Sequence, residues 1–220
     1  MKYKFGVIAG GAIAAVGVYA FVSAINASAE ARSHSPKYSV IETLGDGVEV
    51  RLYQGTLIAQ VQVTGDQRDA LNEGFRILAA YIFGKNTRKM SLNMTSPVVA
   101  QPEKIQMTSP VTCQSTGNTM TVSFFMPPGY SLQTLPEADD SRIHFFELPE
   151  RKLAAIGFSG SWNPQAFSKH AETLVRRLRL SNLQPDGEPF NAYYDPPFMP
   201  PFMRRNEVLI SIADLTTSMR

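Results

Sequence analysis

The chain has 220 residues, of which 44% are hydrophobic and 18% are charged, and its formal net charge is +2 at pH 7. This apolar content is enough for one sizeable core. Because the charge is nearly neutral and forms no basic stripe, we expect no nucleic-acid partner. Cys113 is the only cysteine, which excludes an intramolecular disulfide and thiolate clusters for zinc or iron–sulfur.

The N-terminus carries a targeting or anchoring segment. Residues 5–25 form an uncharged, largely apolar run, which Lys2 and Lys4 precede. Followed by the small residues Ala27 and Ala29, this order is typical of a secretory signal peptide. The run is also long enough to span a bilayer as an uncleaved anchor. Both interpretations stay open.

The domain boundaries follow from this segment. We expect residues 1–29 to be a signal peptide or membrane anchor, residues 30–37 to be a linker, and residues 38–220 to form the folded domain. Either interpretation places the domain on the far side of the membrane, in the periplasm or another extracytoplasmic compartment, with a possible tether through residues 5–25.

Three strands are predicted before the first helix. Alternating apolar residues place them at residues 38–43, 48–53 and 57–64. In the second strand the valines and the leucine alternate with Glu49, Arg51 and Tyr53. We therefore expect one buried face and one face toward water, with Arg51 on the wet face.

A helix is predicted directly after these strands. Asp66 is a suitable N-cap, and apolar residues recur at steps of four, three and four from Leu71 to Ile82. Gly84 stands where a left-handed residue usually ends a helix. The sequence therefore predicts an amphipathic helix from about Asp66 to Gly84.

A five-residue word, Met-Thr-Ser-Pro-Val, occurs at residues 94–98 and again at residues 107–111. The short offset predicts a β-hairpin whose two strands carry the same word. The proline in each copy lacks an N–H, so each strand should end at an edge or a bulge. Two interpretations stay open, namely matched edge strands that close a core, or Met94 and Met107 lining a pocket for a flat apolar ligand.

The second half repeats the order of the first. A second helix begins at Asn163, with Pro164 at its first position, and its apolar stripe has the same spacing as that of the first helix. Strands are predicted at residues 119–126, 142–148, 152–159, 190–194 and 207–212. The order strand, helix, two strands thus occurs twice. We expect an α+β fold in which two similar halves, related by a pseudo-twofold, form a curved antiparallel sheet or distorted β-barrel with two helices.

The residues that could carry chemistry favour a binding site over an active site. His144 and His170 have no carboxylate or histidine at ligand spacing, so we expect no metal site and no catalytic residues. The surplus is instead apolar, since Phe198, Met199, Phe202 and Met203 lie in a proline-rich loop. This loop either plugs the edge of the sheet or holds an apolar groove open against the first helix.

A series of short words in order resembles the SOUL heme-binding protein family over most of residues 38–212. The words are VEVRLY at 48–53, GFR at 74–76, YIFGKN at 81–86, both copies of MTSPV, FMP at 125–127, ELPER at 147–151, FSG at 158–160, YDPP at 194–197 and RRNEV at 204–208. The resemblance implies a distorted barrel of two similar halves. It also implies binding of heme or another tetrapyrrole in a shallow apolar groove along the first helix and the proline-rich loop.

Carried over to this chain, the resemblance places the cofactor-binding residues at Asn72, Phe75, Arg76, Ala79, Met199 and Phe202. It implies apolar contact with the ring, basic side chains at the propionates, and no obligate axial histidine. We therefore expect a monomeric, non-enzymatic protein that binds heme non-covalently and buffers or transfers it. The alternative is a binding module for another apolar small molecule or for a protein partner at the cell envelope.

Overall fold

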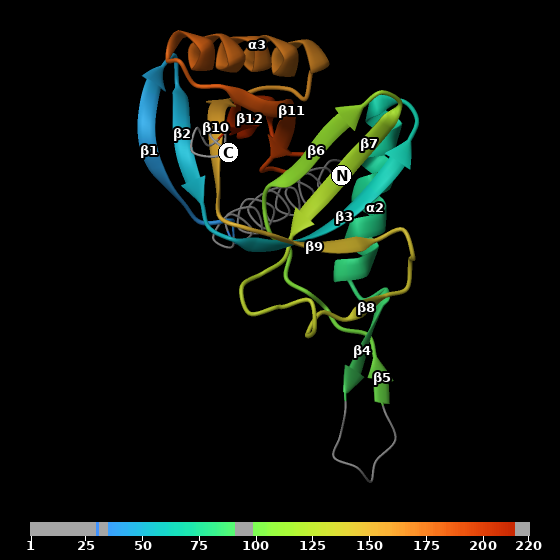
Figure 1. Cartoon of the computed structure of the whole chain (residues 1–220). Helices are drawn as coiled ribbons and strands as arrows, with labels where there is room; N and C mark the ends of the chain where they lie inside the picture. Colours follow the sequence, from blue (N-terminus) through green and yellow to red (C-terminus); the bar gives the residue numbers. More distant parts are fainter. Residues whose placement is uncertain (1–29, 31–34, 91–98, 214–220) are drawn as a thin grey trace, which may run out of the picture.

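The computed structural model describes residues 30, 35–90 and 99–213. It shows an α+β fold with two helices, α2 (Gln67–Ile82) and α3 (Pro164–Leu180), on a curved antiparallel sheet (Figure 1). The strand order of the sheet is β1-β2-β10-β12-β11-β6-β7-β3-β9. These strands are β1 (Tyr38–Gly45), β2 (Val48–Tyr53), β3 (Thr56–Thr64), β6 (Val111–Thr116), β7 (Thr119–Phe125), β9 (His144–Leu148), β10 (Arg151–Phe158), β11 (Pro185–Tyr193) and β12 (Asn206–Ile212).

The sheet is open, so of the two expected forms the curved antiparallel sheet is confirmed and a barrel is not formed. Its two edges are β1 and β9, which pair only with β2 and β3 among the described residues. The pairing of β1 with β2 is irregular, with register shifts between Val40 and Glu42 and between Thr43 and Gly45. A separate three-stranded sheet, in the order β5-β4-β8, extends away from the body (Figure 1). It is formed by β4 (Asn86–Met90), β5 (Val99–Gln101) and β8 (Glu137–Ala138).

The order strand, helix, two strands occurs twice, as expected. In the first unit β3 precedes α2 and pairs with β7, which pairs with β6; in the second, β10 precedes α3 and pairs with β12, which pairs with β11. The first unit differs in that β4 and β5 are inserted before β6. The relation of the two units by a pseudo-twofold axis stays a prediction.

Both helices begin at the predicted caps. The side chain of Asp66 accepts a hydrogen bond from the backbone N–H of Arg68, and that of Asn163 accepts one from Gln165. Pro164 occupies the first turn of α3, where its missing N–H costs nothing. These polar side chains satisfy N–H groups that the helix itself leaves without acceptors.

The two helices cover one face of the sheet. α2 packs on β3 and β7, and α3 packs on β10, β11 and β12. A Cβ on Gly74 would lie 2.5 Å from Cγ2 of Val122, so only glycine permits this close approach of α2 to β7. The core between the helices and the sheet includes Val61, Leu78, Val122, Ile156, Leu174 and Val208.

The hairpin expected for the repeated word is wrong for its second copy. Residues 107–110 belong to no strand, contain a cis peptide bond between Ser109 and Pro110, and lead into β6, which begins at Val111. The hydroxyl of Thr108 donates a hydrogen bond to the backbone carbonyl of Phe125. Pro110 has no N–H with which to continue the β6 pairing in this direction. The first copy lies outside the described residues.

The expectation that Arg51 faces water is also wrong. Arg51 is 5% exposed, and Tyr53 is 8% exposed. The curved sheet buries β2 on both faces, because its second face encloses a smaller apolar cluster that includes Tyr53, Leu153, Tyr194 and Leu209. The guanidinium of Arg51 is satisfied there by two hydrogen bonds, of 2.9 and 3.1 Å, to the carboxylate of Glu207.

No helix within the described residues is long and apolar enough to cross a bilayer. The predicted signal peptide or membrane anchor, residues 1–29, lies outside those residues. The boundaries of the linker and of the folded domain likewise stay predictions.

Candidate functional site

An apolar groove with a volume of about 420 Å³ lies where α2, the segment before β6 and the loop after β11 meet. The groove thus joins segments that are far apart in the sequence. It is lined by Leu71, Asn72, Phe75, Met107, Thr108, Ser109, Val111, Trp162, Tyr193, Tyr194, Asp195, Pro196, Pro197 and Phe198.

Aromatic rings form much of the groove. Phe75 projects from α2 with 38% of its surface exposed, and its ring meets Phe124 edge-on at a centroid distance of 5.3 Å. Phe198 is 68% exposed. Trp162 packs against Tyr193 with ring centroids 4.9 Å apart. Partly exposed rings of this kind offer flat apolar surface to a ligand.

Tyr193, which lines the groove, contacts the buried Cys113, which lies outside the lining. Burial raises the pKa of the Cys113 thiol to about 11, and it raises the pKa of the Tyr193 hydroxyl well above its usual range. The two groups lie 3.7 Å apart, measured from Sγ to the hydroxyl oxygen. At neutral pH Tyr193 therefore presents a neutral phenol to the groove, whose lining also includes the acidic side chain of Asp195.

Arg204 fixes the loop that forms one wall. Its Nε donates to the carbonyl of Met199 at 2.7 Å and its Nη2 to the carbonyl of Pro197 at 2.5 Å. The same guanidinium lies 5.3 Å from the ring centre of Trp162. Arg204 therefore holds the loop through two backbone carbonyls and places its positive charge beside Trp162 of the groove.

The structure brings two of the six expected cofactor-binding residues into the groove. Asn72 and Phe75 line it, one helical step apart on α2. Ala79, one turn further along α2, packs on the core instead.

The other three expected residues lie outside the groove lining. The side chain of Arg76 is 75% exposed and approaches Glu73 at 4.0 Å. Met199 is buried, at 4% exposure, and Phe202 is 78% exposed on the short helix η1 (Pro201–Met203). The loop therefore buries Met199 and contributes Phe198 to the groove lining, whereas a role in plugging the edge of the sheet stays a prediction.

Sequence reasoning missed Trp162, Tyr193 and Arg204. Trp162 lies just before a helix cap, and its role shows only once α3 is placed beside the loop. Met107, in contrast, was singled out by the repeated word, and its position in the lining favours the pocket interpretation of that word. Met94, its counterpart in the first copy, lies outside the described residues.

No group of three or more histidine, cysteine or acidic side chains within the described residues could hold a metal ion. His170 stacks on Phe158 at a centroid distance of 4.0 Å, and its Nδ1 lies 2.6 Å from the carbonyl oxygen of Ala166. It is a packed histidine outside the groove. Of the side chains that line the groove, the thioether of Met107 is the soft metal ligand.

Comparison with known proteins agrees with the resemblance seen in the sequence. The family model of the SOUL heme-binding protein matches residues 33–211. Heme-binding protein 1 of Xenopus laevis is 30% identical over 174 residues, which cover 74% of this chain and 83% of that protein. Heme-binding protein 2 of Mus musculus is 28% identical over 149 residues, which cover 65% of this chain and 66% of the mouse protein.

A solved structure, the C-terminal domain of EcmrR, superposes with a TM-score of 0.51 over 81% of this chain and 99% of that chain. At 8% sequence identity this likeness concerns the fold alone. The match to the family model covers most of the chain, and the chain belongs to the SOUL heme-binding protein family.

Proposed function

We propose that the chain binds heme or another tetrapyrrole non-covalently in the apolar groove, and that it buffers or transfers this ligand without converting it. The carrying observation is the groove itself, which presents flat aromatic surface from α2 and from the loop after β11 in a member of this family. The names of the frog and mouse relatives support the same ligand.

The residues present fit a tetrapyrrole ring. Phe75, Trp162 and Phe198 would contact its faces and edges, and the hydroxyl of Tyr193 in the same lining stays neutral. Asn72 at the rim and Arg204 beside Trp162 are the polar groups nearest to where propionates would emerge. A bound heme would supply the redox and ligand-binding chemistry of its iron, and the chain would hold the ring and exclude water from it.

Apolar contact should therefore dominate the affinity. Because no imidazole of the described residues lines the groove and Met107 is its soft ligand, iron-free protoporphyrin should bind about as well as hemin. Trp162 is the only tryptophan of the chain and lies in the lining. Quenching of its fluorescence thus reports occupation of this groove.

Phe75→Asp is expected to weaken binding of both hemin and protoporphyrin by about tenfold to a hundredfold, because a buried phenylalanine contact contributes about 1.5–3 kcal/mol. The measurement is a titration followed by tryptophan quenching and by absorbance. Phe83→Asp is the matched control, since Phe83 is 61% exposed at the end of the same helix and outside the groove. If hemin alone bound, and bound Phe75→Asp unchanged, an iron ligand elsewhere would replace the groove in this proposal.

A second candidate ligand is another apolar molecule or a protein partner at the cell envelope. It is favoured by the groove lining, which includes Asp195 and, within residues 35–90 and 99–213, no lysine or arginine to meet propionates. Competition separates the two, because an envelope lipid extract that displaces protoporphyrin from Trp162 at far lower concentration would identify an apolar ligand other than a tetrapyrrole. The proposal also includes export of the chain, with or without a tether through residues 5–25, and a monomeric state. Cell fractionation tests the first, and sedimentation tests the second.

A further inference from the structure

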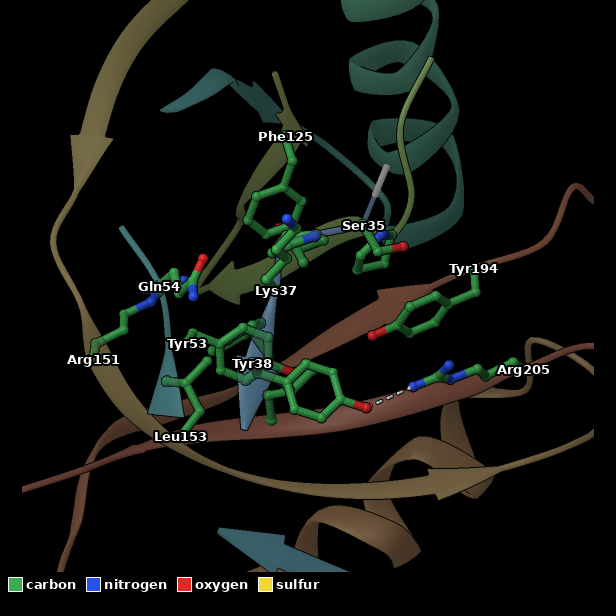
Figure 2. A pocket seen from close by; sticks show the side chains of 15 residues that line it. Ser35, Lys37, Tyr38, Tyr53, Gln54, Phe125, Arg151, Leu153, Tyr194 and Arg205 are labelled. Atoms are coloured by element: carbon green, nitrogen blue, oxygen red, sulfur yellow. Dashed lines mark hydrogen bonds between the residues drawn. The ribbon is translucent and has the colours of Figure 1, made fainter. Parts of the chain in front are cut away.

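A second cavity, with a volume of about 510 Å³, lies on the face of the sheet opposite to the helices (Figure 2). Successive residues of β12 show the two faces, since Val208 and Ile210 belong to the core under the helices, whereas Leu209 belongs to the smaller cluster on the other side. Leu209, Tyr53 and Leu153 of that smaller cluster line the cavity. We call it the concave cavity, and nothing in the proposed heme function uses it.

The charged side chains that line the concave cavity are all basic. Lys37, Arg151 and Arg205 contribute to its wall, and no carboxylate from the described part of the chain does. Glu207, which is 1% exposed, pairs with Arg205 of the wall but is not itself among the lining residues. A cavity walled by one sign of charge attracts ions of the opposite sign.

The carboxylate of Glu207 does not neutralise the positive charge of Arg151 or Lys37, because both of its oxygens already accept hydrogen bonds from other residues. Its Oε1 accepts hydrogen bonds from Arg51 at 3.1 Å and from Arg205 at 2.7 Å, and its Oε2 accepts from Arg51 at 2.9 Å and from the hydroxyl of Tyr194 at 2.7 Å. Arg51 also pairs with Glu49 at 2.8 Å. Two guanidiniums thus meet two carboxylates, and the charges of Arg151 and Lys37 remain in excess.

Arg151 is the best candidate in the wall for pairing with a bound anion. It is half-buried, lines the cavity, and has no hydrogen bond or ion pair to a carboxylate among the described residues. Burial lowers the pKa of its guanidinium, and the electrostatic interaction with Tyr53 raises it by a smaller amount. A guanidinium held out of water without a partner is costly, and a bound anion would offset that cost.

Aromatic side chains also contribute to the wall of the concave cavity. Tyr38 and Tyr53 pack with ring centroids 4.9 Å apart, and the guanidinium of Arg205 lies 4.2 Å from the ring centre of Tyr194. Figure 2 shows Tyr38, Tyr194 and Arg205 grouped at one side of the cavity, with the Tyr38 hydroxyl bonded to Arg205. Rings and guanidiniums together bind flat aromatic molecules by stacking and cation–π contact.

We propose that the concave cavity binds a small planar aromatic anion, whose acid group pairs with Arg151 and whose ring lies among the tyrosines. The volume falls in the range of about 300–1,000 Å³ that is usual for small-molecule sites. The site is separate from the groove on α2, although Tyr194 contributes to the walls of both.

The test compares two fluorescent probes on the full-length chain. Anilinonaphthalene sulfonate is a planar aromatic anion, and N-phenylnaphthylamine is nearly the same molecule without the sulfonate. We expect the sulfonate to bind at least about tenfold more tightly, which corresponds to about 1.4 kcal/mol. Equal affinity for the two probes would overturn the proposal.

Variants locate the probe. Arg151→Gln should lower sulfonate affinity about tenfold and leave the neutral probe unchanged, whereas Arg176→Gln, which removes a cation from the exposed surface of α3, should change neither. Arg151→Lys should retain most of the binding, which guards against a folding defect in Arg151→Gln. Phe75→Asp should leave sulfonate binding intact. Loss of the sulfonate in Phe75→Asp, or its persistence in Arg151→Gln, would assign it to the groove and refute the concave site, whatever the result with hemin.

Discussion

Replacing Glu207 with leucine is expected to lower the free energy of unfolding by about 3–5 kcal/mol, the largest effect of any change considered for this chain. The side chain of Arg51 is only 6% exposed, so it would keep its charge in the interior and retain only the more exposed Glu49 as a carboxylate partner. Tyr194 would lose the acceptor for its buried hydroxyl as well. Urea unfolding of the variant and the parent chain measures the difference.

The double variant Arg51→Met with Glu207→Leu should recover most of this loss, since apolar side chains of similar size can replace a buried ion pair at little cost. Asp46→Asn is the surface control. Asp46 meets Arg177 at 2.5 Å on the exposed side of the molecule, and its replacement should change stability by less than about 1 kcal/mol. A loss in Glu207→Leu no larger than that in Asp46→Asn would mean that water reaches the Arg51–Glu207 pair.

The same pair gives the chain a defined dependence on pH. Burial alone would raise the pKa of Glu207, but hydrogen bonds and positive charge from Arg51 and Arg205 outweigh it and hold the pKa below the usual 4.5. A carboxyl group with a lowered pKa stabilises the fold fully above its unfolded-state pKa and loses this contribution as the pH falls through the folded-state value. The stability difference between the parent chain and Glu207→Leu should therefore be constant above pH 5 and shrink below about pH 4.5. A difference that grew on acidification would contradict this assignment.

Asn86→Ala is expected to cost about 2–4 kcal/mol, because it strips partners from several buried backbone groups at once. Asn86 is 2% exposed, and its amide donates to the carbonyl of Tyr81 at 2.6 Å and to that of Glu103 at 2.8 Å. Its Oδ1 accepts from the N–H of Glu103 at 2.8 Å. This one side chain ties the end of α2 to the segment that leads to Met107, so binding of protoporphyrin should weaken too.

Denaturant unfolding and Trp162 quenching measure the two consequences in the same preparation. Asn118→Ala is the matched control, because Asn118 is exposed in the turn between β6 and β7 and should cost less than about 0.5 kcal/mol. A stable Asn86→Ala protein with unchanged protoporphyrin affinity would show that other contacts hold the segment before β6.

Local signals explain why so much of the fold was predictable. Asp66, Asn163 and Pro164 act through neighbours within a few residues, so the helix starts could be placed from the sequence. The strand at 48–53 was placed correctly for the same reason, but its burial was not. Alternation identifies a strand, yet it cannot reveal that a curved sheet also closes over the polar face and buries Arg51 beside a residue far along the chain.

The polar network and the groove share this limit. Arg51, Tyr194 and Glu207 lie in three of the words that identified the family, but nothing in those words shows that they meet. Likewise Phe75 could be predicted from the family resemblance, whereas Trp162 reaches the groove through tertiary contacts with Tyr193 and Arg204. Contacts between distant segments depend on tertiary packing, which periodicity does not encode.

The open sheet leaves the protein with a hazard that a closed barrel would not have. A free edge strand can recruit the edge of another molecule and start aggregation. On β1 the exposed side chains include Val40 and Ile41, at 49% and 51% exposure, which would favour such self-association. The two register irregularities of β1 break the regular row of free N–H and C=O groups, since bulges twist an edge away from a flat template. The irregular pairing of β1 with β2 thereby disfavours edge-to-edge association between two molecules of the chain.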